Sequence, residues 1–100
     1  MIIPKKLKVG GHVYEVKKGY EFKERSDRCG QSDHEGFEIL LAGRTQKGGK
    51  RPVQAVEETF VHEILHCIDE VYNASALTEE QVYRLSQGLY QVLTDNKMLR

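Results

Sequence analysis

The sequence has no tryptophan, only two prolines, no net charge and no long apolar run. Fifteen basic and fifteen acidic side chains cancel, so the chain lacks both the basic surface of a nucleic-acid-binding protein and a polybasic patch for a membrane. No apolar run approaches the ~20 residues that a bilayer-spanning helix needs. The first residues, MIIPKKLKVGG, contain neither the apolar core nor the cleavage site of a signal peptide. We therefore expect a cytoplasmic protein with neither a nucleic-acid nor a membrane partner.

Cysteine is also scarce, because the chain contains only Cys29 and Cys67. Two residues at such wide spacing do not make a disulfide framework, and a reducing cytosol would keep both as thiols. We interpret Cys67 as a small core residue of a helix and Cys29 as part of a polar loop. Neither is expected to take part in chemistry.

What is present is the composition of an ordinary soluble domain. The chain of 100 residues is 39% hydrophobic and 30% charged, which is typical of globular proteins. No internal repeat, linker or low-complexity segment interrupts it. We therefore predict a single α+β domain that spans residues 1–100.

The first half of the chain carries strand signals. Residues 5–18 alternate between apolar and polar side chains around Gly10-Gly11, which predicts a hairpin. Residues 19–36 are polar and predict a long loop, with room for a short strand around Tyr20 and Phe22. Residues 37–42 form a short apolar run and predict another strand. Together these segments predict a small antiparallel sheet.

The second half carries two helix patterns. The first begins at Pro52, a residue suited to a helix start, and runs to Tyr72 or Asn73. Apolar residues recur along it at steps of three and four and predict one buried face: Val53, Val56, Phe60, Ile64, Ile68 and Val71.

The second helix is introduced by a capping box of Thr78 and Gln81, bracketed by Leu77 and Val82 as a hydrophobic staple. We expect it to end near Asp95. Its predicted buried face consists of Val82, Leu85, Leu89, Val92 and Leu93.

The motif that carries chemistry is HExxH, at residues 62–66 of the first helix. His62 and His66 lie one helical turn apart on the same side, so both imidazoles can reach one tetrahedral Zn²⁺. Glu63 lies beside the metal, where its carboxylate can take a proton from a metal-bound water. The motif predicts a zinc site with Glu63 as the catalytic base.

A catalytic zinc needs a third protein ligand. Glu79, at the start of the second helix, is the first candidate, because a short loop can fold that helix back onto the first. An acidic residue there is also favoured by the helix dipole alone. Glu80 and His34 are further candidates, and Asp69, on the histidine stripe, is either a ligand or an outer partner of His66.

Two tyrosines of the second helix are candidate substrate contacts. Tyr83 and Tyr90 lie on the same stripe as Glu79. A tyrosine hydroxyl there can stabilise the oxyanion of a tetrahedral intermediate. The alternative is that both rings cover the edge of the core.

The residues around the motif are similar to a family of small phage and prophage proteins that carry HExxH. The similar segments are ETFVHEILHCID at residues 58–69 and LTEEQV at residues 77–82, continuing to Asp95-Asn96. The resemblance implies a minimal zincin-like, gluzincin-type metallopeptidase fold, in which an antiparallel sheet packs on the HExxH helix. It implies zinc binding by His62 and His66 and catalysis by Glu63. The chain lacks the distant downstream glutamate of ImmA/IrrE-type peptidases, because only Asp95 is acidic after Glu80.

The sequence therefore predicts a zinc-dependent metallopeptidase that acts on a peptide or protein substrate. The strand at residues 37–42 is a candidate edge of the cleft, where it could pair with an extended peptide. Its alternation is weak, so the alternative for this segment is an ordinary interior strand. The alternative is a non-enzymatic phage-derived interaction or regulatory module, in which the metal site is structural or vestigial.

Overall fold

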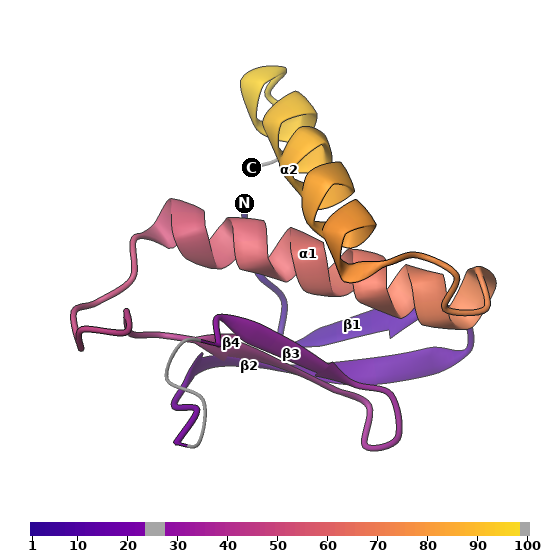
Figure 1. Ribbon diagram of the computed structural model, residues 1–100, viewed down its shortest axis with the longest axis horizontal. Coiled ribbons are helices and arrows are strands. Elements are labelled where there is room, and N and C mark those ends of the chain that lie inside the picture. The colour runs from indigo at the N-terminus through magenta and orange to yellow at the C-terminus, as the bar shows by residue number, and fades with distance from the viewer. Residues whose placement is uncertain (24–27, 99–100) are drawn as a thin grey trace.

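The structure is a computed structural model, and it describes residues 1–23 and 28–98. It confirms the α+β class, with the elements β1 (Lys6–Val9), β2 (His12–Tyr20), β3 (Gly30–Asp33), β4 (Glu38–Ala42), α1 (Val53–Tyr72) and α2 (Glu79–Asp95). Figure 1 shows α1 lying between the sheet and α2, which crosses the far side of α1. Within the described ranges, no helix is both long enough and apolar enough to cross a membrane.

The predicted N-terminal hairpin is confirmed. β1 and β2 pair in antiparallel fashion, with Leu7 opposite Tyr14. Gly10 makes the turn with a φ of 61°, a left-handed conformation that glycine adopts without steric cost. β2 continues to Tyr20, whereas Phe22, where a short strand was expected, lies outside it with its ring 4.8 Å from that of Tyr20.

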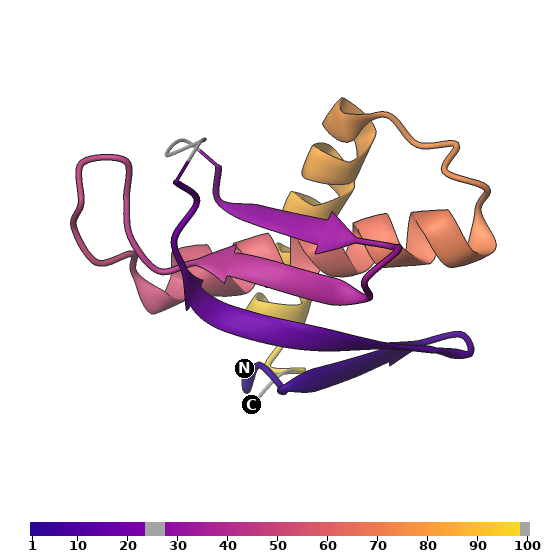
Figure 2. The same ribbon diagram turned by 90° about the horizontal axis from the view of Figure 1, so that it is seen from below.

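The sheet is mixed, with the order β1-β2-β4-β3, so the prediction of a wholly antiparallel sheet is wrong. The β1–β2 and β3–β4 pairs are antiparallel, but β2 and β4 run parallel, with Val16 opposite Ile39. The chain path explains this pairing. After β2 the chain forms β3 at the outer edge and then turns back, so that β4 enters between β2 and β3. Figure 2 shows this path. The alternation of apolar and polar residues within each strand does not reveal which strands become neighbours.

The outer strand β3 comes from the polar segment 19–36 that was predicted to be a loop. Its sequence, GQSD, contains no apolar or β-branched residue, so no alternation marks it. The strand predicted at residues 37–42 is β4, an interior strand in which Ile39 and Leu41 are fully buried. Of the two alternatives for this strand, the interior strand is confirmed and the cleft edge is wrong, because β3 forms that edge of the sheet.

α1 packs on the sheet through a core that includes Phe60, Cys67, Tyr14, Ile39 and Leu41. The helix begins after Pro52 and ends at Tyr72, as predicted. Cys67 is fully buried there, which confirms its interpretation as a core residue. Two residues of the predicted apolar face, Val53 and Ile68, are 71% and 39% exposed. Val53 is the first residue of the helix. Val71, which comes after Ile68 in the helix, packs against the core, so Ile68 lies at the margin of the buried face of α1.

The start and end of α2 agree with the prediction. The Gln81 amide donates to the Thr78 hydroxyl (3.1 Å), and the Thr78 amide donates to the Gln81 side chain (2.8 Å), which completes the capping box. The helix ends at Asp95. Its first turn, which contains Glu79, is therefore fixed by local hydrogen bonds.

The buried face of α2 differs from the prediction. Val82, Ser86 and Tyr90 are buried, whereas the predicted face is exposed at Leu85, Leu89 and Val92. Only the first of the five predicted core positions is fully covered. The physical reason is that, among the described elements, α2 contacts α1 and none of the strands. One neighbouring helix covers a single stripe of α2, which begins at Val82.

Candidate metal centre

The two motif histidines and Glu79 converge on one point. His62 Nε2 and His66 Nε2 lie 3.1 Å apart, and the Glu79 carboxylate oxygens lie 2.8 and 2.9 Å from them. One donor atom from each residue falls within 4.8 Å of the others. Two nitrogens bound to one zinc at ~2.0–2.1 Å lie about 3.3 Å apart in tetrahedral geometry. The spacing of the imidazoles and the donor set therefore suit Zn²⁺.

The loop between the helices brings Glu79 to the histidines, and Asp69 organises that loop. The buried Asp69 carboxylate accepts hydrogen bonds from the Asn73 side chain (2.9 Å) and from the Leu77 amide (3.2 Å). Asp69 is thus engaged at the loop and is not among the converging ligand atoms. It serves the site by holding the loop that turns the chain back as far as Leu77, the residue before Thr78, which caps α2.

The other candidate ligands point elsewhere. Glu80 forms an ion pair with Arg84 on the exposed side of α2. His34 lies in the same cavity as the motif, but its Nδ1 is 3.0 Å from the Tyr14 hydroxyl. Neither joins the converging group, which leaves Glu79 as the third donor.

The two candidate tyrosines have different positions. Tyr83 lines the cavity, and its ring centre is 6.5 Å from that of His62. Tyr90 is buried away from the cavity and donates a 2.6 Å hydrogen bond to Glu57. Burial, together with that hydrogen bond to a carboxylate, raises the pKa of Tyr90 to about 12. Only Tyr83 is therefore placed to contact a substrate.

Glu63 lies beside the donor group and is almost fully buried, with 5% of its surface exposed. The Ser32 hydroxyl donates a 2.6 Å hydrogen bond to its Oε1 across the gap between β3 and α1. Burial raises the pKa of the Glu63 carboxyl, while the hydrogen bond from Ser32 and the charges of His66 and Arg28 act in the opposite direction. A carboxylate with a raised pKa is a better proton acceptor near neutral pH.

The raised pKa predicts that Glu63→Gln stabilises the zinc-free protein at neutral pH. The folded state holds the Glu63 proton more tightly than the unfolded chain, whose carboxyl has the ordinary pKa of 4.5. Wild-type stability therefore falls as the pH rises from that value through the raised pKa, while the glutamine variant has no such proton. Urea unfolding from about pH 4 to about pH 8 measures the difference. A difference between the proteins that is independent of pH would contradict the raised pKa.

The backbone of β3 lies close to α1 at Gly30. A Cβ added to Gly30 would lie 2.6 Å from Thr59 Cγ2 and 3.0 Å from Glu63 Oε2. Only a residue without a side chain permits this approach, which also brings Ser32 within hydrogen-bond distance of Glu63. Nothing in the sequence marked Gly30 or Ser32, because their role depends on a strand that the sequence did not reveal.

Gly30→Ala is therefore expected to lower the free energy of unfolding by about 1–3 kcal/mol, because the added methyl group overpacks the contact with Thr59 and Glu63. Gly88→Ala is the matched control, since a Cβ at this position of α2 meets no atom within 4 Å. It is expected to stabilise the protein by up to about 1 kcal/mol through helix propensity. Urea unfolding of both variants measures the two effects. Equal tolerance of alanine at both positions would contradict the close approach of β3.

His62 has a further partner on α2. Its Nδ1 is 3.4 Å from the Ser86 hydroxyl, which itself donates to the Tyr83 carbonyl at 2.9 Å. The Ser86 oxygen is thus left to accept a hydrogen bond from Nδ1–H, and the tautomer with the proton on Nδ1 leaves His62 Nε2 unprotonated. This is the form in which an imidazole binds a metal.

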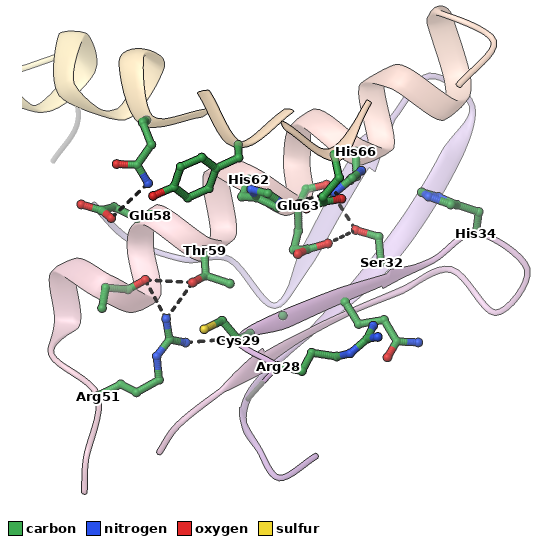
Figure 3. A pocket seen from close by; sticks show the side chains of 16 residues that line it. Arg28, Cys29, Ser32, His34, Arg51, Glu58, Thr59, His62, Glu63 and His66 are labelled. Atoms are coloured by element: carbon green, nitrogen blue, oxygen red, sulfur yellow. Dashed lines mark hydrogen bonds and ion pairs between the residues drawn. The ribbon is translucent and has the colours of Figure 1, made fainter. Parts of the chain in front are cut away.

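The donor group opens into a cavity of about 700 Å³. β3, α1 and the first turns of α2 form its walls, and Figure 3 shows Ser32 on β3 facing Glu63 on α1. Cys29, which the sequence did not place near a metal, also lines this cavity. Glu63 and the three candidate ligands thus line one open cavity.

No protein-family model matches the sequence, and the comparisons with curated proteins and with solved structures give no match. The resemblance to small phage HExxH proteins therefore stays a prediction. What this site can do chemically follows from its own residues.

Proposed function

We propose that the protein is a zinc-dependent peptidase in which His62, His66 and Glu79 hold the metal and Glu63 accepts a proton from water. The observation that carries the proposal is the convergence of three ligand side chains beside a buried carboxylate in one cavity. When bound, zinc supplies Lewis acidity and lowers the pKa of a coordinated water to about 7. The protein positions the ligand side chains, the base Glu63 and the substrate.

Glu63 is held in one orientation for proton transfer. Its Oε1 accepts the hydrogen bond from Ser32, which leaves Oε2 to take the proton from the attacking water. Glu63 then delivers that proton to the amine of the leaving group. Burial supports this role, because it makes the carboxylate a stronger base.

A peptide substrate would lie along β3. Among the described strands, β3 is at the edge of the sheet, and Gly30, Gln31 and Ser32 line the cavity. An extended peptide can add to such an edge through main-chain hydrogen bonds. Tyr83, which is 57% exposed and lines the same cavity, would donate to the oxyanion of the tetrahedral intermediate.

We also propose that the fold is zincin-like. Its support is the packing of the sheet on the helix that carries HExxH, with an antiparallel edge strand, β3, beside the motif. The parallel β2–β4 pair departs from the wholly antiparallel sheet that the phage-family resemblance implies.

Cleavage of a diverse peptide library by the zinc-loaded protein tests the function. We expect mass spectrometry to detect internal cleavage products that disappear on chelation and return when zinc is added back. Failure of the zinc-loaded protein to cleave any library member would contradict the proposal.

One observation favours the alternative of a structural metal in an interaction module. The donor group joins α1 to α2, and α2 has no contact with the strands among the described elements. A structural metal couples to folding, so chelation would then unfold the domain. Glu63 favours the peptidase, because a structural site has no need of a buried carboxylate beside its ligands. The peptidase proposal expects only a small fall in Tm on chelation.

A further inference from the structure

Arg28 is a cation in the cavity that the proposed chemistry does not use. It lies two residues before β3 and lines the same space as Glu63, with its side chain half-buried. Figure 3 shows it beside β3 on the wall opposite the histidines. Among residues 1–23 and 28–98, no carboxylate forms an ion pair with its guanidinium.

Arg51 adds a second positive charge to the same cavity. It is buried, and its guanidinium donates to the carbonyls of Cys29, Ala42 and Ala55 and to the Thr59 hydroxyl. All four of these acceptors are neutral groups. Arg51 therefore ties β3, β4 and α1 together, but its charge is not balanced by a carboxylate among the described residues.

The acidic groups of the cavity are already assigned. Glu79 and Glu63 together carry two negative charges, which a bound Zn²⁺ balances. Among the described residues, Glu58 is the remaining acidic residue of the cavity wall, and the Gln87 side chain lies 3.5 Å from its carboxylate. With the metal in place, the two described arginines outweigh Glu58 by one charge. The described lining of the zinc-loaded cavity is then positive on the β3 side.

We propose that Arg28 binds a carboxylate of the substrate, so that the enzyme prefers peptides with an acidic group close to the scissile bond. This inference rests on the proposed peptidase function. A peptide paired with β3 would have its reacting carbonyl near Ser32 and Glu63 and would extend along the strand toward Arg28. Arg28 lies four residues before Ser32, so at about 3.3 Å per residue this direction places the carboxylate up to about four residues from the bond that is cut. A guanidinium can bind a carboxylate through two parallel hydrogen bonds.

The carboxylate has two possible sources, an Asp or Glu side chain and a free C-terminus. Three matched peptides distinguish them. The first has a glutamate and an amidated C-terminus, the second has glutamine in its place and is also amidated, and the third has glutamine and a free C-terminal carboxylate. Their affinities are measured by calorimetry on zinc-loaded Glu63→Gln protein, which binds without turnover. We expect at least one carboxylate peptide to bind about tenfold more tightly than the neutral one.

Substitutions assign this preference to Arg28. In the Glu63→Gln background, Arg28→Gln is expected to abolish the preference, and Arg28→Lys to retain part of it. Lys8→Gln is the matched control, because Lys8 lies on β1 at the opposite edge of the sheet. Equal binding of acidic and neutral peptides by the Glu63→Gln protein that keeps Arg28 would overturn the proposal. A preference that survives Arg28→Gln would overturn it as well.

The failure of this inference is separate from failure of the function. If the zinc-loaded wild-type protein cleaves the neutral peptide and the acidic peptides equally well, the peptidase stands and the role of Arg28 is wrong. If it cleaves neither these peptides nor any member of the diverse library, the peptidase itself is contradicted, whatever the binding data show.

Discussion

Glu63→Gln is expected to lower kcat for peptide hydrolysis by about 10³, with KM and zinc content close to those of the wild type. Glutamine has the same shape as glutamate, and its carbonyl oxygen can still accept the hydrogen bond that Ser32 donates over 2.6 Å. It cannot, however, take a proton from water. The loss therefore falls on the chemical step, which steady-state kinetics on a library-derived peptide measures directly.

Glu58→Gln is the matched control for this loss. Glu58 lies on α1 and lines the same cavity, but it is outside the converging ligand group and does not contact Ser32. We expect its kcat to stay within a few-fold of wild type, because no proton transfer is assigned to it. Retention of more than about a tenth of kcat by Glu63→Gln would contradict the assigned base, as would an equal loss in both variants.

His66→Ala is expected to weaken zinc binding by more than about a hundredfold, because it removes one of three protein ligands. His34→Ala is the matched control. His34 lines the same cavity, but it faces Tyr14 and is not in the converging group. Competition with a chromophoric chelator gives both affinities. Equal losses in the two variants would mean that zinc is held by a different set of residues.

The third ligand is tested in the same way by two adjacent glutamates. Glu79→Gln is expected to weaken zinc binding strongly, and Glu80→Gln to leave it unchanged. Both residues are in the first turn of α2, so their effects on the helix dipole are similar. Only Glu79 reaches the histidines, whereas Glu80 pairs with Arg84. Unchanged zinc affinity in Glu79→Gln would contradict its assignment as a ligand.

Those parts of the fold that depend on neighbouring residues could be predicted from the sequence. The capping box of Thr78 and Gln81 and the glycine turn at Gly10 act within a few residues, and the structure has both. The spacing of His62 and His66 is likewise local, because one helical turn sets it. The prediction for Glu79 needed a short loop and a strong helix start, which the sequence also displays.

The parts that depend on distant residues could not be predicted. β3 is held as a strand by β4 and by its packing on α1, and its own residues carry no strand signal. The rotation of α2 depends on having one neighbour, so Ser86 is buried while Leu85 is exposed. The roles of Ser32 and Arg28 follow from the position of β3, and for that reason they were missed.

The most direct test of the central claim is the zinc content of the wild-type protein, purified without chelators or a histidine tag and measured by elemental mass spectrometry. The convergence of His62, His66 and Glu79 predicts close to one zinc per chain. A protein that contains no zinc and takes up none from micromolar solution would contradict both the metal centre and the peptidase proposed from it.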